Sequence, residues 1–211
     1  VLFVDHYGIE GMIRAARIAR AAGVEVVADL ERDEHPRFAE ILHLVDHLIL
    51  SRKFATKRTG KQSAREAVEE LAHFGAKVAI VTDGEAGAWV VAEGNCFHFP
   101  AYSVQVVDST GCGDAFHGVY AACLAAGMPL IERLKYSSAA AALKALHLGA
   151  QRGLPNRLEI ETFLDDKSRR PKMFAIQKNY HPGKDSLEWR LKNSNQFIEQ
   201  PAGLIALPQV F

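Results

Sequence analysis

The sequence predicts an α/β fold in which helices cover both faces of a mostly parallel central sheet. Short apolar segments alternate with longer amphipathic ones over residues 1–82, and strands joined by helices form right-handed crossovers and parallel sheets. Of the 211 residues, 48% are hydrophobic and 24% are charged, which is ordinary for a globular protein with one sizeable core. We therefore expect one three-layer α/β/α domain.

The front of the chain supplies the parallel part of this sheet. Strands are expected where short runs of aliphatic residues occur, at residues 1–4, 24–28, 47–50 and 78–82. Helices are expected between them, where apolar residues recur at helical spacing, at residues 11–22, 36–44 and 63–74. In the third helix Ala64, Ala67, Val68 and Leu71 share one face, and Gly75 follows as a stop signal.

The rest of the domain is expected to add a hairpin and a block of helices. Residues 88–91 and 95–99 are joined through Glu93-Gly94, which predicts a β-hairpin at one edge of the sheet. Helices are expected at about residues 113–126, 130–146 and 158–164. These elements place the domain at residues 1–164.

Residues 165–211 depart from this alternation. They are rich in Lys, Arg, Asn and Gln and show no clear period. Tyr180, Trp189 and the apolar residues 204–207 could dock on the domain or on a partner, but the shortage of long apolar stretches favours a poorly ordered extension. The sequence gives no functional account of this extension.

Composition narrows the classes of function. The formal net charge is zero and the pI is about 7.3, so there is no electrostatic case for nucleic acid. No apolar run approaches the roughly 18 residues of a membrane span, and no signal-peptide pattern opens the chain. Cys96, Cys112 and Cys123 form no Cys-x-x-Cys pair, which disfavours zinc and indicates a reducing, cytoplasmic setting.

The segment best suited to chemistry is residues 107–118, Val-Asp-Ser-Thr-Gly-Cys-Gly-Asp-Ala-Phe-His-Gly. It leads into an alanine-rich helix, whose first N–H groups and dipole favour an anion. Backbone donors of Gly111, Cys112 and Gly113 could stabilise a phosphoryl group in transfer, while Asp114 takes the proton of an attacking hydroxyl. The competing interpretation is a turn with a helix cap, since Ser, Thr, Asp and Gly favour such positions for local reasons.

Three ordered motifs resemble those of the ribokinase-like (PfkB family) sugar kinases. Residues 108–114 resemble the family signature Asp-Thr-x-Gly-Ala-Gly-Asp, with Ser109 for Thr and Cys112 for Ala. Residues 81–89 resemble its Val-Thr-x-Gly-x-x-Gly strand and loop, and residues 137–155 resemble its last nucleotide-side helix and loop. The resemblance covers residues 1–164. It implies a ribokinase-like fold and phosphorylation of a sugar hydroxyl by ATP with Mg²⁺.

The resemblance also implies roles for particular residues. Asp114 would be the base, and Gly111, Cys112 and Gly113 would form the anion hole. The nucleotide would be bound by Thr82, Gly84, Gly87, Thr110, Ala140 and Lys144. In some members the equivalent of Asp108 helps to hold a monovalent cation, here K⁺, with carbonyls around His147 and Gly149. From the residues alone, Asp108 is a turn or cap carboxylate, and Gly84 and Gly87 mark a tight turn.

Two departures from the family pattern bear on activity. Residues 51–54 read Ser-Arg-Lys-Phe where the family commonly has Asn-x-x-Glu, and Phe54 cannot accept from a metal-bound water, so Mg²⁺ would rely on the phosphates and other acidic groups. The family's amino-terminal part and lid have no counterpart in the 211 residues. We expect an exposed sheet edge, no appreciable sugar phosphorylation by this chain alone, and activity, with a dimer, in the complete protein.

Two hypotheses follow from different classes. The first is an ATP-dependent sugar kinase, with a sugar that the sequence does not identify. Asp5, Asp29 and Glu31, near the ends of the first two strands, could border its pocket. The second is a nucleotide-binding fragment or interaction module that has lost catalysis. A dehydrogenase is disfavoured because no Gly-x-Gly-x-x-Gly follows an early strand.

Overall fold

A computed structural model describes residues 1–166 of the chain. The expected boundary at residue 164 falls just inside these residues. The expected extension at 165–211 lies almost wholly outside them, together with Tyr180, Trp189 and residues 204–207.

Within residues 1–166, six strands form one sheet in the order β1-β2-β3-β4-β5-β6. The strands β1 (Leu2–Asp5), β2 (Val26–Asp29), β3 (His47–Ser51) and β4 (Val78–Thr82) are parallel. The strands β5 (Ala88–Ala92) and β6 (Asn95–Phe99) are antiparallel to their neighbours, and β6 is the outer strand. The mostly parallel sheet and the edge hairpin predicted from the sequence are thus confirmed.

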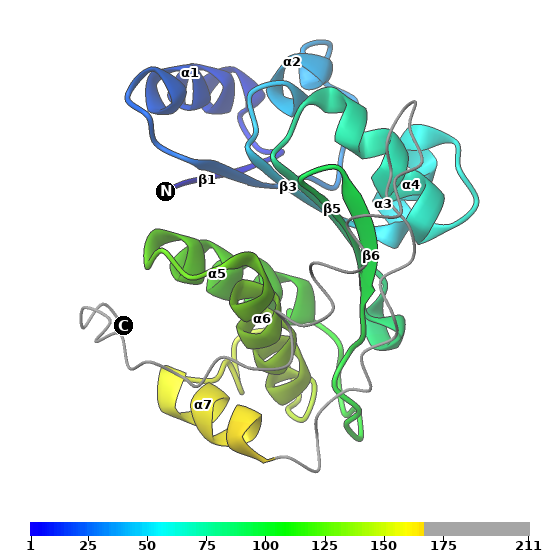
Figure 1. Cartoon of the computed structure of the whole chain (residues 1–211), viewed down its shortest axis with the longest axis vertical. Coiled ribbons are helices and arrows are strands. Elements are labelled where there is room, and N and C mark those ends of the chain that lie inside the picture. The colour runs from blue at the N-terminus through cyan, green and yellow to red at the C-terminus, as the bar shows by residue number, and fades with distance from the viewer. Residues whose placement is uncertain (167–211) are drawn as a thin grey trace, which may run out of the picture.

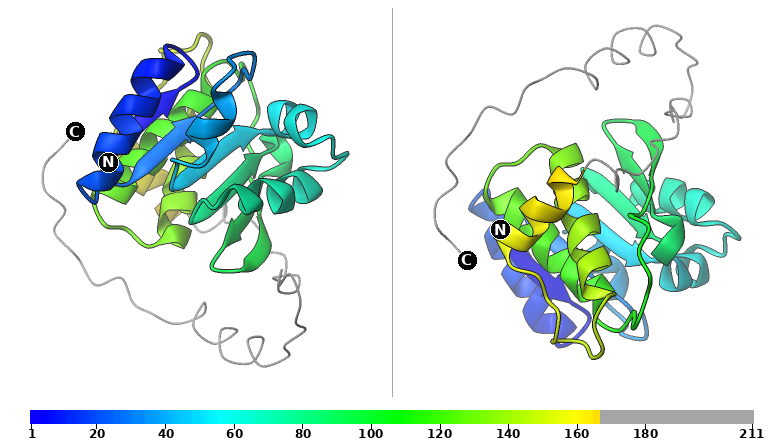
Figure 2. Two further views of the ribbon diagram at one scale, coloured as in Figure 1. Left: turned by 90° about the horizontal axis from the view of Figure 1, so that it is seen from above. Right: turned by 90° about the horizontal axis from the view of Figure 1, so that it is seen from below.

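Helices cover both faces of the sheet (Figures 1 and 2). One face carries α1 (Ile9–Ala21), α2 (Phe38–Leu42), α3 (Arg52–Thr59) and α4 (Ala64–Leu71), the last continued by the 3₁₀ turn η1 (Ala72–Phe74). The other face carries α5 (Cys112–Ala125) and α6 (Leu130–Lys144), with α7 (Arg157–Asp165) packed outside them. A second 3₁₀ turn, η2 (Gly84–Ala86), joins β4 to β5.

Each strand divides its side chains between the two faces. In β3, Leu48 and Leu50 pack in the core under α1–α4, whereas Ile49 packs with Tyr120 of α5 and Leu134 of α6. Apolar residues on both faces explain why the strands read as continuous aliphatic runs, as they do in parallel sheets covered by helices. A third apolar cluster, which includes Tyr102 and Phe163, joins α6 to α7.

One helix was not predicted. α3 follows β3 directly, with Ser51 as its N-cap accepting a hydrogen bond from the N–H of Phe54 at 3.3 Å. Gly60 ends it in the left-handed conformation, φ 71°. Only Phe54 and Ala55 of its eight residues are buried, so the helix has almost no apolar period, and the sequence marks it only by its cap and its stop.

The first strand forms one edge of the sheet. Among the described residues β1 pairs with β2 alone, and Phe3 and Val1 keep 42% and 47% of their surface exposed. An exposed edge strand with apolar side chains is therefore present, as expected. Within residues 1–166, no helix is both long and apolar enough to cross a membrane.

A buried polar network connects the sheet to the helices at the amino-terminal ends of the parallel strands. His47 Nδ1 lies 3.0 Å from the hydroxyl of Tyr120, which accepts a hydrogen bond from Arg133 at 3.1 Å. His47 Nε2 lies 3.3 Å from a carboxylate oxygen of Glu25. Burial, followed by the nearby positive charge of Arg133, lowers the pKa of His47 to about 4. The imidazole is therefore neutral in the folded protein at neutral pH.

This pKa predicts a loss of stability in acid. A histidine whose pKa falls from 6.5 to about 4 on folding leaves the unfolded chain with more bound protons between these values. Its contribution is present above the unfolded pKa and is lost as the pH falls. Linkage gives a loss of about 2 kcal/mol between about pH 7 and pH 5. Urea unfolding of wild type and His47→Gln at both pH values measures it, and equal pH dependence in the two proteins would contradict the assignment.

Candidate active site

The carboxyl ends of the four parallel strands meet the start of α5 at one edge of the sheet. Asp29 ends β2, and Thr82 ends β4 opposite Ser51. His117, in the second turn of α5, lies across this edge: its Nε2 is 3.0 Å from the carbonyl oxygen of Ile49 and its Nδ1 is 3.4 Å from Oδ2 of Asp29. Ligands of open parallel sheets bind at this edge, so the fold places residues 107–114 where a ligand is expected.

The first turn of α5 offers unpaired amides to that edge. The helix has no side-chain cap, and its N-cap is Gly111. The N–H of Cys112 donates to the carbonyl of Ser109 at 3.1 Å and that of Ala115 to Gly111 at 2.9 Å. The N–H groups of Gly113 and Asp114 have no acceptor within residues 1–166. Of the three expected donors, the turn engages the amide of Cys112, whereas those of Gly111 and Gly113 have no acceptor within residues 1–166, and the amide of Asp114 joins them.

The two glycines of this turn, Gly111 and Gly113, are explained by different features of the structure. Gly111 has φ 81°, and a Cβ there would lie 2.6 Å from the carbonyl oxygen of Ala150, so the backbone requires glycine. Gly113 has an ordinary helical φ and open space around the position of a Cβ. The backbone does not require glycine at position 113, and its absent side chain leaves the approach to the free amides open.

Asp114 is exposed in this first turn, as a base that meets a substrate must be. Its negative charge is one of those that raise the pKa of Asp29, although burial of Asp29 is the largest cause. The two carboxyl groups therefore act at short range on the same small region, and Asp29 also faces His117.

Asp108 ties the turn to the last loop of the domain. One carboxylate oxygen accepts from the N–H of Thr110 at 2.9 Å and the other from the N–H of Gly149 at 2.8 Å. These two hydrogen bonds, Thr110 first, lower the pKa of Asp108 to about 2. Asp108 therefore stabilises the turn, as its residue type favours, and the amides of Thr110 and Gly149 are engaged by it.

Two residues expected at the nucleotide lie inside the protein. Ala140 and Lys144 of α6 are both fully buried. Ala140 packs in the core between α6 and α7, and the ammonium of Lys144 donates to the carbonyls of Asp108 and His147 at 3.2 and 3.1 Å. Neither side chain reaches the open edge, since both lie on the inward face of α6. The sequence did not show this, because helical spacing alone does not say which face of a helix turns inward.

The strand-loop motif at residues 81–89 forms a tight turn. Gly87 has φ 91°, and a Cβ there would lie 2.2 Å from the carbonyl oxygen of Phe99. Gly84 has φ 54° but open space around it. Thr82 donates a long hydrogen bond, 3.4 Å, to the carbonyl of Leu50. Close packing against the end of β6 thus accounts for Gly87, while Thr82 and Gly84 lie at the ligand edge.

The segment that departs from the family pattern is structural. Phe54 is 4% exposed and packs edge-on against Phe38, with ring centroids 5.9 Å apart. It offers nothing to a metal-bound water. Within residues 1–166, no three His, Cys, Asp or Glu side chains come together as a metal-binding group. Asp5, Asp29 and Asp114 are among the carboxyl groups at this edge, and Mg²⁺ is commonly held by one or two carboxylates together with phosphates.

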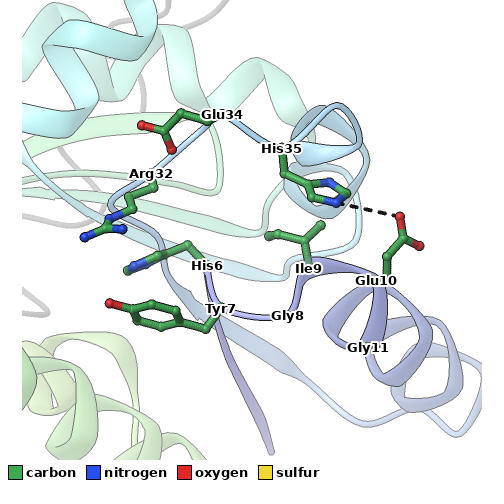
Figure 3. A pocket seen from close by; sticks show the side chains of 9 residues that line it. All are labelled: His6, Tyr7, Gly8, Ile9, Glu10, Gly11, Arg32, Glu34 and His35. Atoms are coloured by element: carbon green, nitrogen blue, oxygen red, sulfur yellow. Dashed lines mark ion pairs between the residues drawn. The ribbon is translucent and has the colours of Figure 1, made fainter.

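A pocket of about 530 Å³ opens beside the site, at the ends of β1 and β2 and the start of α1 (Figure 3). Its lining includes His6, Tyr7, Arg32 and His35. The guanidinium of Arg32 lies 5.9 Å from the ring centre of Tyr7, and the Nε2 atom of His6 is buried with no hydrogen-bond partner among residues 1–166.

Sequence reasoning named Asp5, Asp29 and Glu31 in this region but not these four residues. The carboxylates Asp5, Asp29, Glu31 and Asp114 are not among the residues that line the pocket. The sequence did offer a signal for the lining residues His6, Tyr7, Arg32 and His35, because each follows a predicted parallel strand. His6 and Glu31 lie near enough to Asp29 to act on its pKa, as Asp114 does, so the pocket adjoins the site.

Comparison with known proteins identifies the relatives of this arrangement. A family model described as pfkB family carbohydrate kinase matches residues 2–157. The ribokinase of Haemophilus influenzae is 30% identical over 167 residues, which are 74% of this chain and 53% of that protein. The chain spans about half the length of this curated relative.

Solved structures agree. A ribokinase of Arabidopsis thaliana complexed with ribose and ATP has a TM-score of 0.71 and 26% identity, with 77% of this chain and 55% of that chain covered. A putative ribokinase II of E. coli in complex with ATP and Mg²⁺ has a TM-score of 0.64 and 28% identity, with 72% and 52% covered. Together with the sheet order and the Asp108–Asp114 turn, these matches show that the chain belongs to the pfkB family of carbohydrate kinases.

Proposed function

We propose that this chain is the nucleotide-binding part of a kinase that transfers a phosphoryl group from ATP to a sugar hydroxyl. One observation carries the proposal: Asp114 is exposed in the first turn of a helix whose N–H groups at Gly113 and Asp114 find no acceptor in the described part of the chain, at the ligand edge of the sheet. A base beside an anion site is what phosphoryl transfer to an alcohol needs.

In this mechanism the chain's residues position groups and move one proton. The free amides at the start of α5 stabilise the negative charge on the transferred phosphoryl group. Asp114 accepts the proton of the attacking hydroxyl. When bound, Mg²⁺ would neutralise the nucleotide phosphates, and Asp29, at the end of β2, would contribute a carboxyl group to holding it. Thr82 and Gly84 would border the nucleotide on its other side.

We place the acceptor sugar on the side of the pocket between β1, β2 and α1. His6 has a buried ring nitrogen with no partner in the part of the chain that the structure describes, and Arg32 and Tyr7 offer further donors. The link to the base is electrostatic, since His6 and Asp114 both act on the pKa of Asp29. Ribose, fructose, ketodeoxygluconate, a nucleoside and a sulfonated sugar all stay open as acceptors. A cytoplasmic location and a homodimer of the complete protein stay predictions.

A first test places the nucleotide. Gly113→Asp puts a carboxylate beside the free amides without backbone strain, because the position is helical and open. We expect ATP affinity to fall at least about tenfold in calorimetry with and without Mg²⁺. Gly113→Ala adds a methyl group without charge and should change affinity by only about two- to threefold. Equal affinity in wild type and Gly113→Asp would remove the nucleotide from this turn. Position 113 suits the test better than 111, where any side chain strains the turn.

A second test concerns the base. Asp114→Asn keeps the shape of the side chain and removes the proton acceptor. In the complete protein, we expect sugar-dependent ADP release to fall about 10²- to 10⁴-fold while ATP affinity changes little. A variant that keeps most of its turnover would remove Asp114 from the mechanism. ATP binding with no turnover in the wild-type protein would favour the alternative, a catalytically incompetent nucleotide-binding module.

A further inference from the structure

A buried lysine lies directly behind the anion site. Lys144 is the last residue of α6 and is 0% exposed. Its ammonium donates to the backbone carbonyls of Asp108 and His147, at 3.2 and 3.1 Å. Within residues 1–166 it forms no ion pair with a carboxylate at 4.0 Å or less. A charged group this deeply buried is costly unless its surroundings replace water. The two carbonyl oxygens take the place of water around the ammonium.

The surroundings of Nζ have the chemistry of a site for a monovalent cation. Carbonyl oxygens from two separate loops converge on it, and the ionised carboxylate of Asp108 belongs to the same residue as one of them. Lys144 is among the groups that lower the pKa of Asp108. The carbonyl of Asp108 also faces the thiol of Cys112, with Sγ at 3.9 Å. The carbonyl oxygens and the carboxylate of Asp108 together favour one positive charge at the position of Nζ.

Potassium does not fit these oxygens while Lys144 is present. An ammonium group and a potassium ion carry the same charge, are similar in size, and take the same carbonyl ligands. The carbonyls around residue 147 and Asp108 are those at which a monovalent cation was expected, and Nζ already occupies two of them. A potassium ion bound there would also meet the charge of the lysine at close range.

We propose that the Lys144 ammonium is a built-in replacement for a bound monovalent cation, so that the anion site of this chain works without potassium. The lysine connects the loop at 107–111 to the loop at 145–150. The same two loops are joined by the bonds of Asp108 to Gly149 and of Val107 to Ala145, the latter 2.8 Å. Lys144 is thus a positioning residue, which holds the turn whose amides face the nucleotide.

The size of the expected effect follows from what the lysine holds. Removing the ammonium takes one hydrogen bond from the carbonyl of Asp108 and one from that of His147, both in a partly buried setting, and such losses cost stability. The turn at Gly111 has little freedom to adjust, because it packs against the backbone of Ala150. Loss of the charge should therefore loosen both loops and lower nucleotide affinity along with stability.

The test compares ions at constant ionic strength. Wild type should have the same Tm, within about 1 °C, and the same ATP affinity in potassium chloride and in tetramethylammonium chloride. Lys144→Ala leaves room for an ion, so its Tm should fall by about 5 °C or more in tetramethylammonium and recover in potassium. Lys144→Met fills the space without charge, so its Tm should fall and stay low in both salts.

Lys135→Ala is the matched control, since Lys135 is partly exposed on the same helix and, within residues 1–166, pairs only with Glu132. Its Tm should change little and should not depend on the ion. A wild-type protein stabilised specifically by potassium would overturn the proposal without any variant, as would a Lys144→Ala protein that potassium does not restore. The ATP measurement rests on the proposed function, whereas Tm does not. A protein that binds no ATP but shows the predicted Tm pattern would contradict the kinase proposal alone.

Discussion

The connection between the loops at 107–111 and 145–150 is the constraint on which the candidate site depends. Neither loop belongs to the sheet: the first precedes α5 and the second follows α6. Asp108 bonds to Gly149, Lys144 bonds to the carbonyl of Asp108, and Gly111 packs on Ala150. These contacts fix where α5 begins, and the start of α5 determines where its free amides point.

The sheet provides the second half of the site by a simpler rule. Four parallel strands must end at the same edge, so residues far apart in sequence, such as Asp5, Asp29 and Thr82, come to one side of the molecule. His117 joins this edge to α5 by facing Ile49 and Asp29. The amino-terminal ends of the strands carry the buried network of His47, Tyr120 and Arg133, which links the sheet to the helices and takes no part in the site. Chemistry and structural support are thus separated to opposite ends of the strands.

Much of the fold could be predicted from local patterns. Aliphatic runs identified the four parallel strands, and Glu93-Gly94 identified the hairpin, because these features depend on neighbours along the chain. α3 was missed because its sequence has almost no apolar period. Its N-cap, Ser51, stands where the family motif has Asn, and a serine at that position does not by itself predict a helix. Phe54 showed the same limit: its residue type excluded a role with metal, but only packing against Phe38 shows what it does.

By itself, the sequence determined the order of the elements, the turn at residues 108–114 and the residue types that suit phosphoryl transfer, because periodicity, capping and turn preferences act over a few residues. Only the tertiary structure decided which groups face one another. It buried Ala140 and Lys144, engaged the amide of Cys112, and opened a pocket at His6 and Arg32. Burial and contact depend on how elements distant in sequence pack. For that reason the function of Lys144, a residue with an ordinary place in a helix, could be inferred only from the two carbonyls that it reaches.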